Sequence, residues 1–245
     1  MLFRSARTRA LTEQVLKWYE GFEFHRIYHA VNEFAIADLS AFYLDVLKDR
    51  MYTFAPSSQA RRSAQTVLWK ITETLVRLLA PILSFTADEV WDYLPAVAGR
   101  EVSVHLALFP APAEIYPEDP APLLAEWKHI FDVRDGALLV LEQARQDKHI
   151  GKGLEAELQI RATGEMLTLL QSHAAGLKEI LNVSGVSVIE GHELSITAHP
   201  ASGTKCSRCW NFMPAVASYG IWESVCTRCH EALKTMGIEP PKGNA

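Results

Sequence analysis

The sequence lacks the short motifs that mark many nucleotide-dependent enzymes and hydrolases. It contains no G-x-x-x-x-G-K-[ST] phosphate-binding loop, no G-x-G-x-x-G dinucleotide fingerprint and no G-x-S-x-G nucleophile turn. The acidic residues of the chain are explained as helix-start or solvated charges, since no nucleophile, base and orienting group come together. We therefore predict no catalytic residues and no catalytic activity for this chain alone.

Long hydrophobic runs are also missing. Charged residues interrupt every apolar stretch well before the 18 residues that a membrane-spanning helix requires. The first ten residues carry basic side chains, but they have neither the apolar segment nor the cleavage site of a secretory signal. These absences predict a cytoplasmic protein with no membrane partner.

Excess positive charge is lacking as well. The net charge is −5, which argues against a protein that coats nucleic acid non-specifically. The charges are uneven, however, because residues 201–245 contain five basic and three acidic side chains, whereas residues 116–200 contain seven and thirteen. Any contact with a polyanion is therefore expected near the end of the chain.

The chain has only four cysteines, and all of them fall within residues 206–229. They form two C-x2-C pairs separated by sixteen residues: Cys206 and Cys209, then Cys226 and Cys229. Four thiolates arranged in two such pairs are typical of a structural zinc site, which uses tetrahedral coordination and leaves no position open for catalysis. Two disulfides or four unrelated core cysteines are the alternatives. We predict one structural zinc ion, with His230 outside the ligand set.

Helical periodicity dominates the first half of the sequence. Apolar residues recur every three or four positions from Phe22 to Arg50, from about Ser58 to Ala80, and in a short helix that Thr86 is expected to open. Such amphipathic helices bury their apolar stripes against one another. The sequence thus predicts a bundle within residues 1–115, ending in a proline-rich linker with an extended segment at 103–109.

The second half changes period. A helix is expected over residues 123–148, and alternating apolar residues then predict strands near 155–161, 185–189 and 194–198, the last two forming a hairpin. We predict a mainly α protein: the helical bundle, a small α+β unit within 116–200, and a four-cysteine zinc ribbon within 201–245.

Basic and aromatic residues on the cysteine pairs are candidates for binding RNA. Trp210 directly follows Cys209, and a tryptophan held rigidly there can stack on an unpaired base, although packing inside the ribbon is an alternative. Arginine and lysine can contact phosphates or base edges. The candidates that carry positive charge are Lys205, Arg208 and Arg228 near the cysteines, and Arg61 and Arg62 at the start of a bundle helix.

Several segments together resemble one enzyme family. They are 24–28 (FHRIY), 38–52 (DLSAFYLDVLKDRMY), 61–68 (RRSAQTVL), 78–95 (LLAPILSFTADEVWDYLP), 134–158 (RDGALLVLEQARQDKHIGKGLEAEL), 205–212 (KCSRCWNF) and 226–233 (CTRCHEAL). In this order they are similar to the anticodon-binding helical domain and C-terminal zinc module of bacterial-type isoleucyl-tRNA synthetases, which are class I aminoacyl-tRNA synthetases. The helical segments alone would also fit the valyl and leucyl relatives, and the KCSRCW segment favours the isoleucyl branch.

The resemblance implies a tRNA-binding, anticodon-side part of an isoleucine-tRNA ligase. In that family the catalytic domain, which uses ATP, and the editing domain lie upstream in the same polypeptide, so this chain would be the C-terminal part of a longer enzyme. The implied partners are an isoleucine-accepting tRNA and that catalytic domain, in a monomer. The four cysteines match the family's zinc ligands. The alternative is a free-standing zinc-ribbon protein, derived from such a domain, that binds another RNA or a protein.

Overall fold

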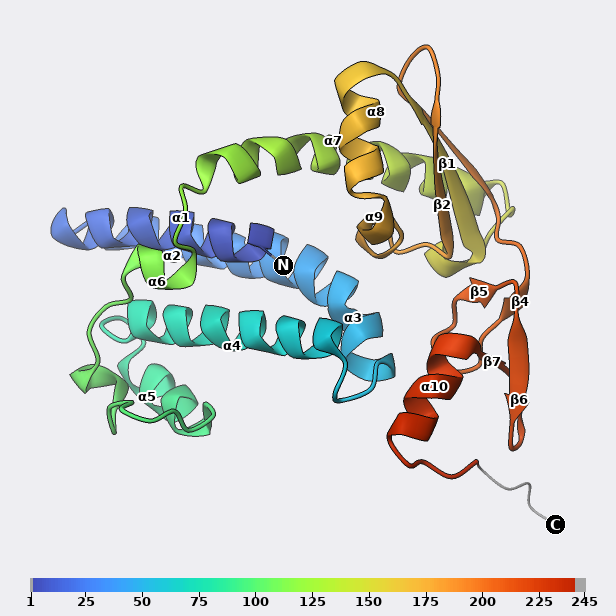
Figure 1. The fold of residues 1–245 in the computed structure, drawn as a ribbon. Coiled ribbons are helices and arrows are strands. Elements are labelled where there is room, and N and C mark those ends of the chain that lie inside the picture. The colour runs from blue at the N-terminus through green and yellow to red at the C-terminus, as the bar shows by residue number, and fades with distance from the viewer. Residues whose placement is uncertain (1, 241–245) are drawn as a thin grey trace. The chain divides into compact units, whose positions relative to one another are not determined.

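The structure is a computed structural model that describes residues 2–240 (Figure 1). The last five residues of the predicted zinc module lie outside this range. The chain divides into two compact units, Met1–Asp45 with Arg62–Trp127, and Val46–Arg61 with Lys128–Ala245. Within them the predicted fold class is confirmed: mainly helix, one small three-stranded sheet, and four cysteines gathered near the C-terminus. The bounds of the three predicted domains stay a prediction.

The first unit is built from helices. Its elements are α1 (Leu2–Glu20), α2 (Phe24–Glu33), the π-helix η1 (Phe34–Tyr43), the first residues of α3 (Leu44–Thr53), α4 (Gln59–Leu79), α5 (Ser84–Tyr93), the 3-10 turn η2 (Val104–Leu106), α6 (Pro112–Ile115) and the start of α7 (Ala121–Gln146). The helical prediction for residues 22–50 is confirmed, but the middle of that helix takes the wider π form. There, Phe34, Phe42 and Tyr43 are buried, whereas Ile36 is exposed, so one face of this stretch packs on the core.

Helix α5 differs from its predicted start. Thr86 was expected to cap the helix, but α5 already begins at Ser84 and no side chain caps its first residue. Asp88 instead accepts hydrogen bonds from the Ser103 hydroxyl at 2.6 Å and the Val104 amide at 3.3 Å. These bonds hold Val104–Leu106, in the middle of the predicted extended segment 103–109, in the turn η2, and Trp91 is buried in the same cluster as Val104. The extended prediction is wrong at these three residues, because a local carboxylate satisfies the backbone amide that a strand would have paired.

The sheet of the second unit has an order that the sequence did not predict. Strand β1 (Ala156–Ala162) lies in the centre, parallel to β2 (Gly185–Glu190) and antiparallel to β3 (Ser195–Pro200). The predicted hairpin between the last two strands is therefore wrong, since both pair with β1. Helices α8 (Gly164–Ser172) and α9 (Ala174–Leu181) connect β1 to β2.

One face of this sheet is buried. Ala156, Leu158, Ile160 and Ala162 of β1 are all buried, whereas the alternate residues of that strand are half-buried or exposed. Helix α8 lies against β1 and β2, and α9 lies against β2 (Figure 1). Gly136 of α7 lies close to the Ile196 side chain of β3. The helices thus form one layer, and the sheet forms the other.

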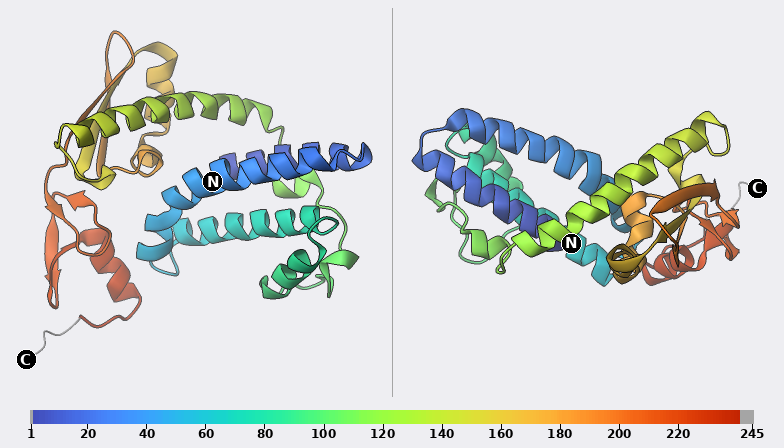
Figure 2. Two further views of the ribbon diagram at one scale, coloured as in Figure 1. Left: turned by 180° about the vertical axis from the view of Figure 1, so that it is seen from behind. Right: turned by 90° about the horizontal axis from the view of Figure 1, so that it is seen from above.

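The remaining elements form the region that carries the four cysteines, which the sequence predicts to be a zinc ribbon. After the 3-10 turn η3 (Gly153–Glu155) and the sheet, the chain makes two short hairpins and a helix: β4 (Thr204–Lys205) with β5 (Phe212–Met213), β6 (Val216–Tyr219) with β7 (Trp222–Cys226), and α10 (Thr227–Thr235). Helix α10 packs beside β6 and β7, as the left panel of Figure 2 shows from behind. Within residues 2–240, each helix is too short or too polar to cross a lipid bilayer.

Candidate metal centre and nucleic-acid interface

The two cysteine pairs occupy turns that aim their sulfur atoms at one point. In the first pair, the Cys206 amide donates to the Asn211 carbonyl and the Trp210 amide donates to the Cys206 carbonyl, both at 2.9 Å. In the second pair, β7 ends at Cys226, and Cys229 lies in the first turn of α10. The Cys226 amide points at the Cys206 sulfur, 3.3 Å away. Backbone geometry therefore brings both pairs together.

All four cysteine side chains are buried, and their sulfur atoms lie within 4.8 Å of one another. The Cys209 and Cys226 sulfurs are 3.8 Å apart. A tetrahedron with metal–sulfur bonds of about 2.3 Å has sulfur–sulfur edges of about 3.8 Å, so the spacing fits a four-thiolate metal site. The cysteines are free rather than joined in disulfides.

Electrostatics also favour a cation at this point. Hydrogen bonding from Cys209 holds the pKa of the Cys206 thiol well below its usual range, whereas hydrogen bonding with Cys206 raises the pKa of Cys209 and of Cys229. Four thiolates this close repel one another, and a bound divalent cation removes that repulsion. His230 is not one of the grouped donors, and its ring packs edge-on against Tyr219 at 5.2 Å.

Trp210, the aromatic residue among the predicted RNA contacts, faces solvent. Its side chain is 59% exposed, so the alternative of packing inside the ribbon does not describe it. Its backbone adopts φ = +63°, a left-handed conformation that costs a non-glycine residue about 1–3 kcal/mol. The turn thus holds a large indole in solvent on a backbone that glycine would adopt more easily.

The arginines next to the cysteines are used inside the molecule. Arg208 donates to the Thr53 carbonyl and, at 3.4 Å, to the Tyr52 carbonyl. Arg228 forms a two-pronged ion pair with Asp49, in which Nη2 lies 2.8 Å from Oδ1 and Nη1 donates to Oδ2. Its guanidinium also lies 4.5 Å from the centre of the Phe54 ring. Sequence reasoning placed both arginines on an RNA surface and missed their partners in Val46–Arg61.

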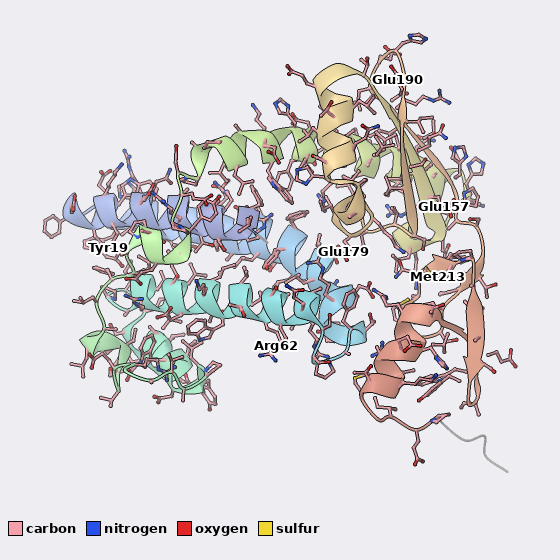
Figure 3. All side chains as sticks on the ribbon, in the orientation of Figure 1. Tyr19, Arg62, Glu157, Glu179, Glu190 and Met213 are labelled. Atoms are coloured by element: carbon pink, nitrogen blue, oxygen red, sulfur yellow. The ribbon has the colours of Figure 1, made fainter. Side chains whose placement is uncertain are left out.

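Of the other basic candidates, Arg61 is hydrogen-bonded within the molecule, whereas Arg62 and Lys205 are exposed. Arg61 donates to the Phe54 carbonyl at 2.9 Å, within the second unit. Arg62 is exposed on α4, where Figure 3 labels it. Lys205 is exposed on β4, and its charge lies close enough to Glu155 to help lower the pKa of that carboxyl, after the larger effect of the Gly151 amide. Trp210, Lys205 and Arg62 are therefore the candidates whose side chains face solvent.

An apolar groove in the first unit offers no catalytic alternative. Its volume is ≈ 270 Å³. Residues of η1, α3, α4 and α5 line it, together with Leu83 from the connection between α4 and α5. The lining is aliphatic apart from the hydroxyls of Thr72 and Thr86, and it contains no acid, base or thiol. Nothing in this groove assembles the groups that acid–base or nucleophilic chemistry requires.

Known protein families and sequences are similar to most of this chain. Residues 5–160, well over half of the chain, match the family described as the anticodon-binding domain of tRNA ligase. The chain is similar to the isoleucine–tRNA ligase of Azoarcus sp., at 44% identity over 95% of this chain and 25% of that protein. It is similar to those of Symbiobacterium thermophilum, at 37% over 95% and 26%, and Geobacter sulfurreducens, at 40% over 91% and 25%.

The chain spans about a quarter of the length of these curated relatives. The first two matches cover 95% of the chain, so they extend over most of the helical first unit and over the cysteine pairs. Because residues 5–160 match the family model, the chain belongs to the anticodon-binding domain family of tRNA ligases.

Proposed function

We propose that this chain is the tRNA-binding, anticodon-side part of an isoleucine-tRNA ligase. The family match and the similarity to isoleucine–tRNA ligases support this assignment. In this proposal the complete enzyme attaches isoleucine to its tRNA with ATP, and a catalytic domain elsewhere in the same cytoplasmic, monomeric polypeptide performs the chemistry. The chain described here binds the anticodon side of the isoleucine-accepting tRNA.

Zinc is the metal that the cysteine cluster is proposed to hold. Cys206, Cys209, Cys226 and Cys229 supply four soft thiolate donors, which structural zinc sites use, and no fifth position remains for water or substrate. The ion would fix the two turns and the residues next to them. Its proposed role is therefore to shape the surface that carries Trp210 and Lys205.

The proposed RNA contact rests on Trp210, whose side chain is exposed and whose backbone is in the left-handed conformation. Backbone strain persists where the surrounding structure holds it, and it concentrates at binding sites. An indole that is rigid and solvated before binding can stack on an unpaired base with little loss of side-chain entropy. Lys205 on the adjacent strand is proposed to contact a phosphate.

The test is tRNA titration of zinc-loaded protein at fixed salt. Trp210→Ala is expected to weaken binding of isoleucine tRNA by about tenfold to a hundredfold, since base–aromatic stacking contributes about 1–3 kcal/mol per base. Ile221→Ala is the matched control, because Ile221 is also exposed in this module, at 55%. If the two variants bind equally well, Trp210 is not an RNA contact.

A second titration separates tRNA recognition from general RNA binding. Isoleucine tRNA should bind more tightly than the same tRNA with an exchanged anticodon. Equal binding of both would instead favour a zinc-ribbon protein that recognises another RNA or a protein.

A further inference from the structure

The cysteine module contacts the rest of the second unit at more than one point, and the short segment Val46–Arg61 bonds to both of its cysteine pairs. This segment contains most of α3 and the loop before α4. Its residues bond to two parts of the second unit that are distant in sequence: the α+β part and the cysteine module. Elsewhere, the Phe212 amide donates to the Ser184 hydroxyl at 2.8 Å. Bonds at both cysteine pairs restrict the orientation of the module, and with it that of Trp210.

On one side, Arg50 of α3 forms an ion pair with Glu179 of α9, which Figure 3 labels. Both side chains are only 22% exposed, so they retain little contact with water. This pair fixes α3 against the helix layer of the three-stranded sheet. It gives the segment a firm base within the second unit.

On the other side, the residue next to Arg50 reaches the second cysteine pair. Asp49 holds Arg228, which lies between Cys226 and Cys229, through both carboxylate oxygens. The Thr53 hydroxyl donates to the same Asp49 carboxylate at 2.7 Å. Two-pronged arginine–carboxylate pairs fix orientation as well as distance, because both groups are planar.

The first cysteine pair is held by the same segment. Arg208, between Cys206 and Cys209, donates to the carbonyls of Thr53 and Tyr52 at the end of α3. Each cysteine turn therefore directs one arginine to the C-terminal end of one helix. Helix C-terminal carbonyls attract cations, which adds to the effect of Asp49.

We propose that Asp49 is a positioning residue for tRNA binding: by holding Arg228 it orients the zinc module so that Trp210 meets the RNA. Asp49 itself does not touch the RNA in this proposal, which rests on the RNA contact proposed above. We expect loss of the pair to leave the four thiolates and the fold of the module intact and to change its orientation, even though the bonds of Arg208 and Phe212 remain. The two arginines then serve the attachment, and Trp210 serves the contact.

Whether Asp49→Asn strengthens or weakens tRNA binding distinguishes a positioning role of Asp49 from a simple effect of its charge. Asp49→Asn removes a negative charge, so simple electrostatics predicts tighter binding to a polyanion. The proposal predicts the opposite: weaker binding by about fivefold or more, the low end of typical coupling between sites. Glu223→Gln is the matched control, since Glu223 is an exposed carboxylate on β7 of the same module. It should leave tRNA affinity unchanged or slightly higher.

A double variant tests whether Asp49 acts through Trp210. If it does, Asp49→Asn with Trp210→Ala should bind tRNA no more weakly than Trp210→Ala alone, because the orientation of a missing indole has no effect. Additive losses would overturn the proposal. So would unchanged or tighter binding by Asp49→Asn in zinc-loaded protein with one metal per chain.

An NMR measurement without RNA separates this proposal from the proposed function. Amide residual dipolar couplings of the zinc module and of the three-stranded sheet should fit one alignment tensor in the wild-type chain and two different tensors in Asp49→Asn. A single shared tensor in the variant contradicts the positioning role whatever the RNA result. If the tensors separate but Trp210→Ala binds tRNA normally, Asp49 still orients the module, while the RNA contact assigned to Trp210 fails and the proposal for tRNA binding fails with it.

Discussion

The Trp210 amide donates to the Cys206 carbonyl at 2.9 Å, and this bond closes the first cysteine turn with Trp210 in the left-handed region at φ = +63°. The turn requires that backbone conformation, whereas the side chain does not contribute to closing it. Backbone stability and the proposed RNA contact therefore favour different residues at this position.

Replacement of Trp210 by glycine should separate these demands. Glycine adopts positive φ without a steric penalty, so Trp210→Gly is expected to be more stable than Trp210→Ala by about 1 kcal/mol. Both variants should lose the same tRNA affinity, because both lack the indole. Thermal unfolding of the zinc-loaded variants and parallel tRNA titrations measure the two effects. A stability order with alanine above glycine would show that the turn relaxes without the indole.

The metal should be required for the module and not for the helices. Purified protein is expected to contain about one zinc per chain, held by four thiolates. Cys226→Ser or removal of zinc by a chelator should unfold residues near 204–238, since binding energy at such sites is folding energy. The far-UV signal of the helices should persist. Metal-free protein with two disulfides and an ordered module would contradict the four-thiolate assignment.

Lys205 is expected to change the salt dependence of tRNA binding. Each phosphate contact on a single-stranded loop contributes about 0.7 to the slope of log affinity against log salt. Lys205→Gln should therefore make the slope shallower by about that amount. Lys234→Gln removes the same charge from an exposed position on α10 and is the matched control. Equal slopes for the two variants would show that Lys205 contributes only general charge.

Local patterns predicted the elements of this chain better than their contacts. The cysteine spacing alone brought Cys206, Cys209, Cys226 and Cys229 to one point, because each C-x2-C turn needs only neighbouring backbone. The partners of Arg208 and Arg228 lie more than 150 residues away in sequence, and no local period encodes such a contact. From the sequence alone, Asp49 and Arg228 would each be interpreted as a solvated charge, because only the fold brings them together.

The strand order was missed for a related reason. Two strands separated by four residues suggested a hairpin, but the connection passes over the end of β1 instead. The Gly191 amide donates to the Ala162 carbonyl at 2.9 Å, and a Cβ at Gly191 would lie 2.8 Å from the Cβ of Arg161. Gly191 was visible in the sequence as a turn residue. Its close approach to β1 arises only in the folded chain, so the local sequence carries no signal for it.

Gly191→Ala tests this crossing directly. The added methyl group would press against Arg161 Cβ, which cannot move without moving β1, so we expect a loss of about 1–3 kcal/mol in the free energy of unfolding, as for overpacked cores. Gly176→Ala is the matched control, because Gly176 lies in α9 and its nearest atom to a new Cβ is the Ile180 Cδ1 at 3.8 Å. Alanine favours a helix over glycine, so this variant should be as stable as the wild type or more stable. Chemical denaturation of both variants measures the difference. If Gly191→Ala unfolds at the same denaturant concentration as Gly176→Ala, the connection has room to move, and the order β2-β1-β3 must depend on the pairing of β1 rather than on the crossing.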